Sequence, residues 1–192
     1  MTVQDQRKQK MSRFFIAATL PVTLQKAFAA AIDRVRTLDP QASFVPQQNL
    51  HLTLRFIGDV NVKKQAVIQR ALSELVFAPE DERLVSWQRY GFFAARNGET
   101  LIARLQVTDA LQTAAAMIEM KLQEIGLQPD RRRWTPHVTL ARRVASERID
   151  LSSFDLPALP PEAVPAINLY LSERTPHAMR YTVLQTLYGQ GE

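Results

Sequence analysis

The feature that most constrains this chain of 192 residues is a short frame, His-x-Thr-Leu, that occurs twice. The first copy lies in NLHLTLRFIG, residues 49–58, and the second in PHVTLARR, residues 136–143. The chain has only three histidines, and two of them, His51 and His137, begin these frames. A fold for this chain must therefore explain two histidines that have matching neighbours but lie far apart in sequence.

Both frames have the alternation of a β-strand with one buried face. Residues i and i+2 of a strand point to the same side. His51 and Thr53 therefore share one face, and the leucines around them form the other. His137 and Thr139 share a face in the same way. The pattern predicts two strands that each present an imidazole and a hydroxyl opposite an apolar face.

An imidazole beside a hydroxyl, present twice, suits acid–base catalysis on a phosphodiester. Histidine populates both protonation states near neutral pH. One imidazole can therefore take a proton from the attacking oxygen while the other gives one to the leaving oxygen. A threonine hydroxyl can donate to the non-bridging phosphate oxygens. Arginine binds phosphate without a metal, and Arg131, Arg132 and Arg133 precede the second frame.

Two other interpretations of the histidines stay open on the residues alone. A single histidine in a strand is most often structural, although the matched frames argue against this for the pair. Two histidines and a carboxylate would make a zinc site, but neither frame holds an acidic residue. The third histidine, His177, lies in RTPHAMRY, where nothing is repeated, and we expect it to be structural or exposed.

Composition is that of an ordinary soluble protein, with 46% apolar and 22% charged residues. No apolar run approaches the ~20 residues that span a bilayer.

The polar N-terminus is followed by no signal-peptide core. We therefore expect a disordered leader over 1–12, with Met11 as an alternative start, and a cytoplasmic protein. The absence of cysteine excludes disulfides and fits a reducing compartment. The net charge of +5 weakly favours an anionic partner.

Hydrophobic periodicity divides the remainder, residues 13–190, into strands and helices of one bilobal domain. Pro21 begins the first helix, and Asn97-Gly98 marks a hairpin. Residues 39–49 are expected to form a loop and 155–165 a proline-rich connector. Helices are predicted over 21–38, 62–75 and 109–126, and strands over 13–21, 50–58, 83–93, 100–107, 137–142, 166–174 and 180–188. This order suggests two similar α+β lobes.

The segments around both frames resemble the two-histidine phosphoesterases. RFFIAATLP, NLHLTLRFIGDV, RRRWTPHVTLARR and INLYLSERTPHAMRYTVLQTL are together similar to the bacterial RNA 2',3'-cyclic phosphodiesterase family, also called 2'-5' RNA ligases. The resemblance extends from Arg13 to Tyr188. It implies an α+β fold of two pseudo-symmetric lobes, each an antiparallel-rich sheet with helices on the outside, and an active-site cleft between them.

The resemblance also implies a reaction and roles for the motif residues. An RNA terminal 2',3'-cyclic phosphate would be opened to a 2'-phosphate without a metal or cofactor, with possible reversible 2'-5' RNA ligation. His51 would be the general acid to the 3'-oxygen and His137 the general base to water. Thr53 and Thr139 would donate to the phosphate oxygens.

Three further residues are candidates for substrate binding by the same resemblance. Phe56 matches a position that stacks on the terminal base, Arg132 matches an arginine before the second motif, and Trp134 replaces a commoner phenylalanine. Strict alternation would instead bury Phe56 with Leu52 and Leu54, unless a bulge turns it outward.

The implied partners are RNA ends or 2',3'-cyclic nucleotides, with no membrane and no obligatory protein partner. The alternative is an RNA- or oligoadenylate-binding module with little catalytic activity. The intact histidines and threonines favour the enzyme. Binding without turnover over a broad set of substrates would favour the module.

Overall fold

The computed structural model describes residues 11–154, 159–176 and 179–187. The helices are α1 (Val22–Leu38), α2 (Val62–Leu72) and α3 (Asp109–Glu124). The strands are β1 (Ser12–Thr19), β2 (Ser43–Phe44), β3 (His51–Val60), β4 (Leu84–Ala95), β5 (Gly98–Val107), β6 (His137–Val144), β7 (Glu162–Ala163), β8 (Ile167–Arg174) and β9 (Met179–Leu187). Single turns of 3-10 helix lie at Gln47–Asn49, Glu80–Glu82, Ser146–Arg148 and Leu151–Ser153.

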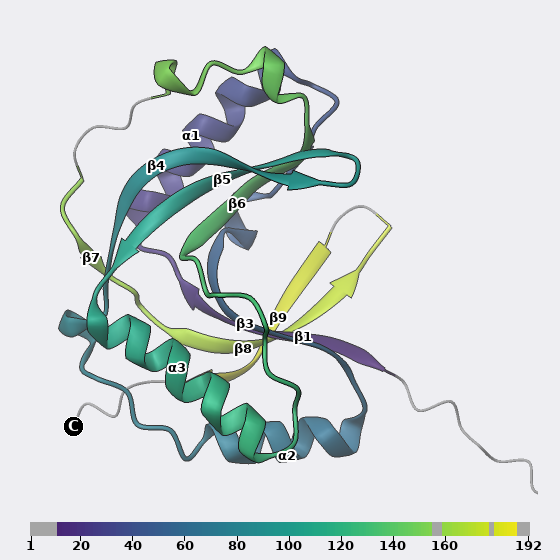
Figure 1. Cartoon of the computed structure of the whole chain (residues 1–192), viewed down its shortest axis with the longest axis vertical. Helices are drawn as coiled ribbons and strands as arrows, with labels where there is room; N and C mark the ends of the chain where they lie inside the picture. Colours follow the sequence, from purple (N-terminus) through teal and green to yellow (C-terminus); the bar gives the residue numbers. More distant parts are fainter. Residues whose placement is uncertain (1–10, 155–158, 177–178, 188–192) are drawn as a thin grey trace, which may run out of the picture.

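The strands form two antiparallel sheets, one in each lobe (Figure 1). The first sheet has the order β3-β1-β8-β9, and the second has the order β2-β6-β5-β4-β7. The first histidine frame begins β3 and the second begins β6. The predicted fold class, α+β with two antiparallel lobes, is therefore confirmed.

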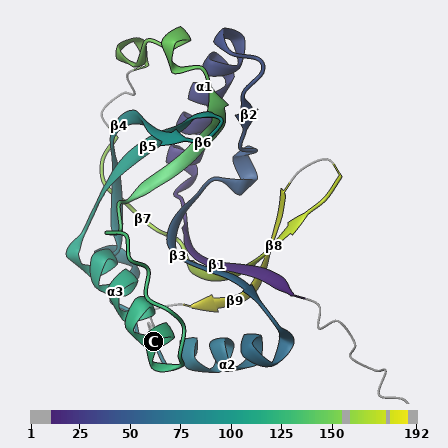
Figure 2. The ribbon, with the colours of Figure 1, turned by 45° about the vertical axis from the view of Figure 1, so that its right-hand side comes forward.

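Helices α1 and α3 each pack in the lobe opposite to that of the strand that precedes them in the chain. Helix α1 follows β1 of the first sheet, yet it packs on the second sheet, where Phe28 meets the ring of Tyr90 on β4 at 6.4 Å. Helix α3 follows β5 of the second sheet, yet it lies beside α2 and against β3 of the first (Figure 2). Each lobe therefore contains segments from both halves of the chain. The sequence did not predict this exchange.

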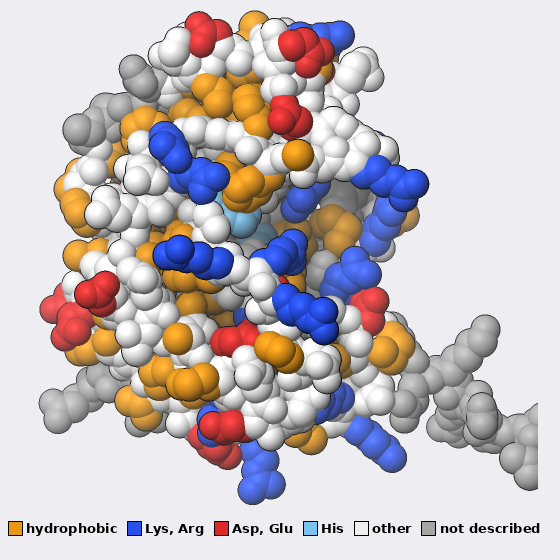
Figure 3. Space-filling view, in the orientation of Figure 1, with side chains coloured by type: hydrophobic (Ala, Val, Ile, Leu, Met, Phe, Trp, Pro, Cys, Tyr) orange, Lys and Arg blue, Asp and Glu red, His pale blue; other side chains and the backbone are white. Residues whose placement is uncertain are grey.

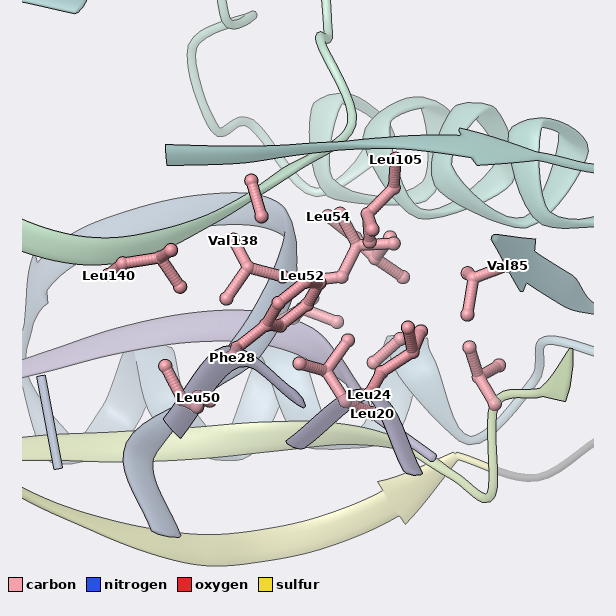
Figure 4. Packing of buried hydrophobic residues seen from close by; sticks show 14 of the residues in the cluster. Leu20, Leu24, Phe28, Leu50, Leu52, Leu54, Val85, Leu105, Val138 and Leu140 are labelled. Atoms are coloured by element: carbon pink, nitrogen blue, oxygen red, sulfur yellow. The ribbon is translucent and has the colours of Figure 1, made fainter. Parts of the chain in front are cut away.

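The apolar faces of the two motif strands share one core. Leu52 of β3 and Val138 and Leu140 of β6 are fully buried in the same cluster. Figure 4 shows them with Leu24 and Phe28 of α1 between the sheets. Because a close-packed core resists displacement, this cluster fixes the two strands, and so the two histidines on their other faces, relative to each other.

A bulge in β3 changes which side chains face the cleft. Ala17 of β1 pairs with Thr53, but its neighbour Ile16 pairs with Arg55, so Leu54 is an extra residue. An extra residue shifts the alternation by one, and Phe56 therefore leaves the buried face and is 53% exposed. The burial that strict alternation predicts for Phe56 is wrong for this reason.

Strand β6 carries the same irregularity. Leu140 is the extra residue here, so Arg142 takes the position that corresponds to Phe56. A second bulge follows at Arg143, whose φ is 57°. Opposite it, Gly98 has φ +87°, and a Cβ there would lie 3.1 Å from the Arg143 backbone. Glycine thus lets β5 approach the bulge that follows Arg142.

The predicted elements are all present, with small differences at their ends. Helix α2 ends at Leu72, three residues before the predicted end. The proline-rich connector contains a short strand, β7, that pairs with the start of β4. The leader residues 1–10, the connector residues 155–158, and His177 lie outside the described residues. In the described part of the chain, no helix is long and apolar enough to cross a membrane.

Replacing Leu52 by alanine tests the shared core. Leu52 has no exposed surface, so Leu52→Ala should lower the free energy of unfolding by about 2–5 kcal/mol through lost burial and the cavity that remains. Urea unfolding measures this change. The matched control is Met120→Ala, because Met120 is 58% exposed on α3 and its truncation should change stability by less than about 0.5 kcal/mol. Equal effects would contradict the shared core.

Candidate active site

The two motif histidines are held by the same backbone contact. Nδ1 of His51 lies 2.7 Å from the carbonyl oxygen of Asn49, and Nδ1 of His137 lies 2.7 Å from that of Thr135. A carbonyl oxygen only accepts hydrogen bonds, so Nδ1 carries the proton and donates in both rings. In the neutral ring Nε2 is then the atom that can accept a proton from a ligand.

Aromatic rings enclose His51. The ring centroids of Phe15 and Tyr181 lie 4.9 and 5.4 Å from that of His51. This burial lowers the pKa of His51 to about 4, and the positive charge of Arg142 and the neighbouring His137 act in the same direction. In the free protein the His51 imidazole is therefore neutral at neutral pH.

His137 has fewer aromatic neighbours. The ring of Phe93 on β4 meets it edge-on at 4.9 Å. Burial lowers the pKa of His137 as well, and the charges of Arg104 and Arg142 add to this effect. Both imidazoles thus face positive charge, which opposes their protonation until an anion is bound nearby.

A small pocket of about 80 Å³ joins the two motifs. Its lining includes both histidines and both threonines, His51, Thr53, His137 and Thr139. The volume is well below the roughly 300–1,000 Å³ of pockets that bury a whole drug-sized ligand, so it suits a single phosphate group. The structure therefore brings together all four motif residues that the sequence singled out.

The pocket also contains residues that the sequence reasoning missed. Arg142 of β6, Arg13 of β1 and Tyr181 of β9 line it. Only Arg142 left a signal in the sequence: it follows His137 by five residues, as Phe56 follows His51. A direct comparison of the two frames would have identified this position.

The three substrate-binding candidates lie in a larger cavity beside the pocket. This side groove, of about 720 Å³, runs between the end of β3, helix α3 and the segment 130–135. Arg132 and Trp134 line only the groove, whereas Phe56 lines both the groove and the pocket. Nε of Arg132 lies 3.6 Å from Oδ1 of Asp130, with which it forms an ion pair.

Trp134 connects the two motifs. Its indole Nε1–H donates to the carbonyl oxygen of Thr53 at 2.9 Å. The contact joins the segment before β6 to the bulged part of β3. At a bulge the backbone hydrogen bonds between neighbouring strands are interrupted. Trp134 therefore links the two histidine frames from the groove side.

Arg55 is committed to structural contacts. It forms an ion pair with Glu119 of α3, and its guanidinium also donates to the carbonyl oxygens of Phe56 and Gln128.

Within the described residues, no group of three or more histidine, aspartate or glutamate side chains is arranged to hold a metal ion.

The enclosure of His51 predicts an unusual titration. In the free protein the imidazole of His51 should titrate near pH 4, and inorganic phosphate should raise that pKa because an anion favours the imidazolium. NMR of the ring nitrogens measures both the midpoint and the Nδ1–H tautomer. A midpoint at or above 6.5, or a proton on Nε2 in the neutral ring, would contradict the geometry.

Comparison with known proteins points to one family. The family model of the 2'-5' RNA ligase superfamily matches residues 24–176. A relative from Methanothermobacter thermautotrophicus, an RNA 2',3'-cyclic phosphodiesterase, is 24% identical over 182 residues, which cover 90% of this chain and 96% of the relative.

Solved structures show the same fold. A protein from Thermus thermophilus superposes with a TM-score of 0.69 at 24% identity and covers 91% of this chain and 96% of its own. Escherichia coli LigT in complex with 3'-AMP superposes with a TM-score of 0.69 at 22% identity. The match covers 92% of this chain and 97% of LigT. With a family match over most of its length and this shared fold, the chain belongs to the 2'-5' RNA ligase superfamily.

Proposed function

We propose that this protein hydrolyses an RNA terminal 2',3'-cyclic phosphate to a 2'-phosphate, without a metal, by acid–base catalysis between its two motif histidines. One observation carries the proposal. Both imidazoles have Nδ1 occupied by a backbone carbonyl and line one small pocket with the two motif threonines. The name of the archaeal relative and the binding of 3'-AMP, a nucleoside 3'-phosphate, by LigT support the same chemistry.

In the proposed reaction, water attacks phosphorus opposite the 3'-oxygen. Nε2 of His137 takes a proton from the water as the new P–O bond forms. The bond from phosphorus to the 3'-oxygen breaks, and Nε2–H of His51 gives its proton to that oxygen. His137 ends protonated and His51 neutral, and exchange with solvent restores the starting state.

The low pKa of His51 fits this scheme only with substrate bound. At about 4 the free imidazole holds no proton at neutral pH. The phosphate anion in the pocket raises this pKa, because an adjacent opposite charge favours the charged form. Substrate binding thus favours the imidazolium form of His51, which is the form that can protonate the leaving 3'-oxygen.

Three side chains stabilise the charge on the phosphate in this proposal. The hydroxyls of Thr53 and Thr139 donate to the non-bridging oxygens. Arg142 supplies a positive charge at the same pocket, and a guanidinium can contact phosphate through two parallel N–H groups. With an RNA 5'-hydroxyl in place of water, the same displacement of the 3'-oxygen would form a 2'-5' phosphodiester, which is 2'-5' ligation.

Removal of either histidine should abolish turnover. His51→Ala and His137→Ala should each lower kcat on a 2',3'-cyclic nucleotide by roughly 10²–10⁴-fold, as measured by chromatography of the products. The wild-type product should be the 2'-phosphate, and EDTA should leave the rate unchanged. Thermal unfolding of each variant serves as the folding control. Full activity in either folded variant would refute the proposal.

A substrate with sulfur in place of the bridging 3'-oxygen separates the two roles. A thiolate leaves without protonation, because its pKa is far below that of an alcohol. On this substrate His51→Ala should recover most of the wild-type rate, whereas His137→Ala should not. Recovery by His137→Ala instead would reverse the assigned order of acid and base.

A further inference from the structure

The side groove is continuous with the histidine pocket. Both cavities are lined by Thr53, Phe56, His137, Thr139 and Arg142. Figure 3 shows the hollow of this face, with histidine side chains at its floor and Lys and Arg side chains around it. A ligand anchored in the pocket by its phosphate can therefore extend into the groove without crossing a barrier.

The chemistry of the proposed substrate sets the direction of that extension. A terminal cyclic phosphate occupies both the 2'- and the 3'-oxygen of the last ribose. The RNA chain can then continue only from the 5'-oxygen of that ribose. Whatever fills the groove beyond the terminal nucleotide must belong to the 5' side of the RNA.

The groove offers aromatic surfaces whose positions are fixed. The indole of Trp134 is held by its hydrogen bond to the Thr53 carbonyl. The ring of Phe93 has the guanidinium of Arg104 over one face, 5.2 Å from its centroid, and His137 at its edge. Unstacked RNA bases bind to such rings with little base preference.

The charges of the groove favour a polyanion. The carboxylate of Glu119 is paired with Arg55, and that of Asp130 with Arg132. Arg133 also lines the groove, and it forms no ion pair with any residue in the part of the chain that the structure describes. A positive groove with aromatic rings is the usual design of single-strand binding sites.

We propose that the side groove binds the nucleotides on the 5' side of the cyclic phosphate, so that the preferred substrate is an oligonucleotide end and not a cyclic mononucleotide. This inference rests on the proposed function. Phe56, at the junction of the two cavities, takes the terminal base. Trp134, Phe93 and Arg133 hold the preceding nucleotides.

The first test compares two substrates and two neighbouring arginines. Wild-type kcat/KM should be at least roughly tenfold higher for a short RNA that ends in a cyclic phosphate than for the matching 2',3'-cyclic mononucleotide. Arg133→Ala should lower the ratio of the two kcat/KM values roughly five- to tenfold. Arg131→Ala is the matched control: Arg131 is exposed in the same segment but does not line the groove, and this variant should leave the ratio unchanged.

A second pair of variants tests the groove by its volume. Ala116 is an exposed residue of α3 that lines the groove, so Ala116→Trp should fill it and lower the same ratio. Thr113→Trp, at an exposed position of the same helix outside the groove, should not.

The outcomes separate the inference from the function on which it rests. Turnover of the mononucleotide with no preference for the oligonucleotide would overturn the groove assignment and leave the proposed function intact. Equal ratios in Arg133→Ala and Arg131→Ala would also overturn it. No turnover of either substrate by the wild type would refute the proposed function itself.

Discussion

The site depends on the packing of two strands against one core. Leu52 of β3 and Val138 of β6 are buried in the same cluster, which fixes the strands that carry His51 and His137. Each imidazole is then locked by a bond to the carbonyl two residues earlier. The position and tautomer of both rings therefore follow from backbone geometry and core packing. A pocket formed this way needs no flexible loop to assemble it.

The two motif strands are similar in backbone but different in the side chains they present. Each has an extra residue after the threonine, at Leu54 in one strand and Leu140 in the other. The bulges bring Phe56 into the cleft on one side and Arg142 on the other. In the proposed reaction an aromatic ring suits a base and a guanidinium suits a phosphate. The pseudo-symmetric fold thus gives a directional site for an asymmetric substrate.

Strand alternation in the sequence was enough to predict the shared faces of His51 with Thr53 and of His137 with Thr139. It could not predict the bulges, because an extra residue in a strand depends on pairing with neighbours distant in sequence. For that reason strand alternation alone predicts neither the exposure of Phe56 nor the position of Arg142 at the pocket. The exchange of α1 and α3 between lobes is likewise a tertiary feature, since amphipathic helices specify a buried face but not the sheet that covers it.

The central claim is that the two Nε2 atoms act on opposite sides of one phosphorus. A crystal structure with a nucleoside 2',3'-vanadate, which imitates the five-coordinate transition state, tests it most directly. The account predicts Nε2 of His51 and Nε2 of His137 within roughly 2.6–3.2 Å of the two apical oxygens, with His51 at the 3'-oxygen. Contact of both imidazoles with the same oxygen, or of only one imidazole with the vanadate, would contradict it.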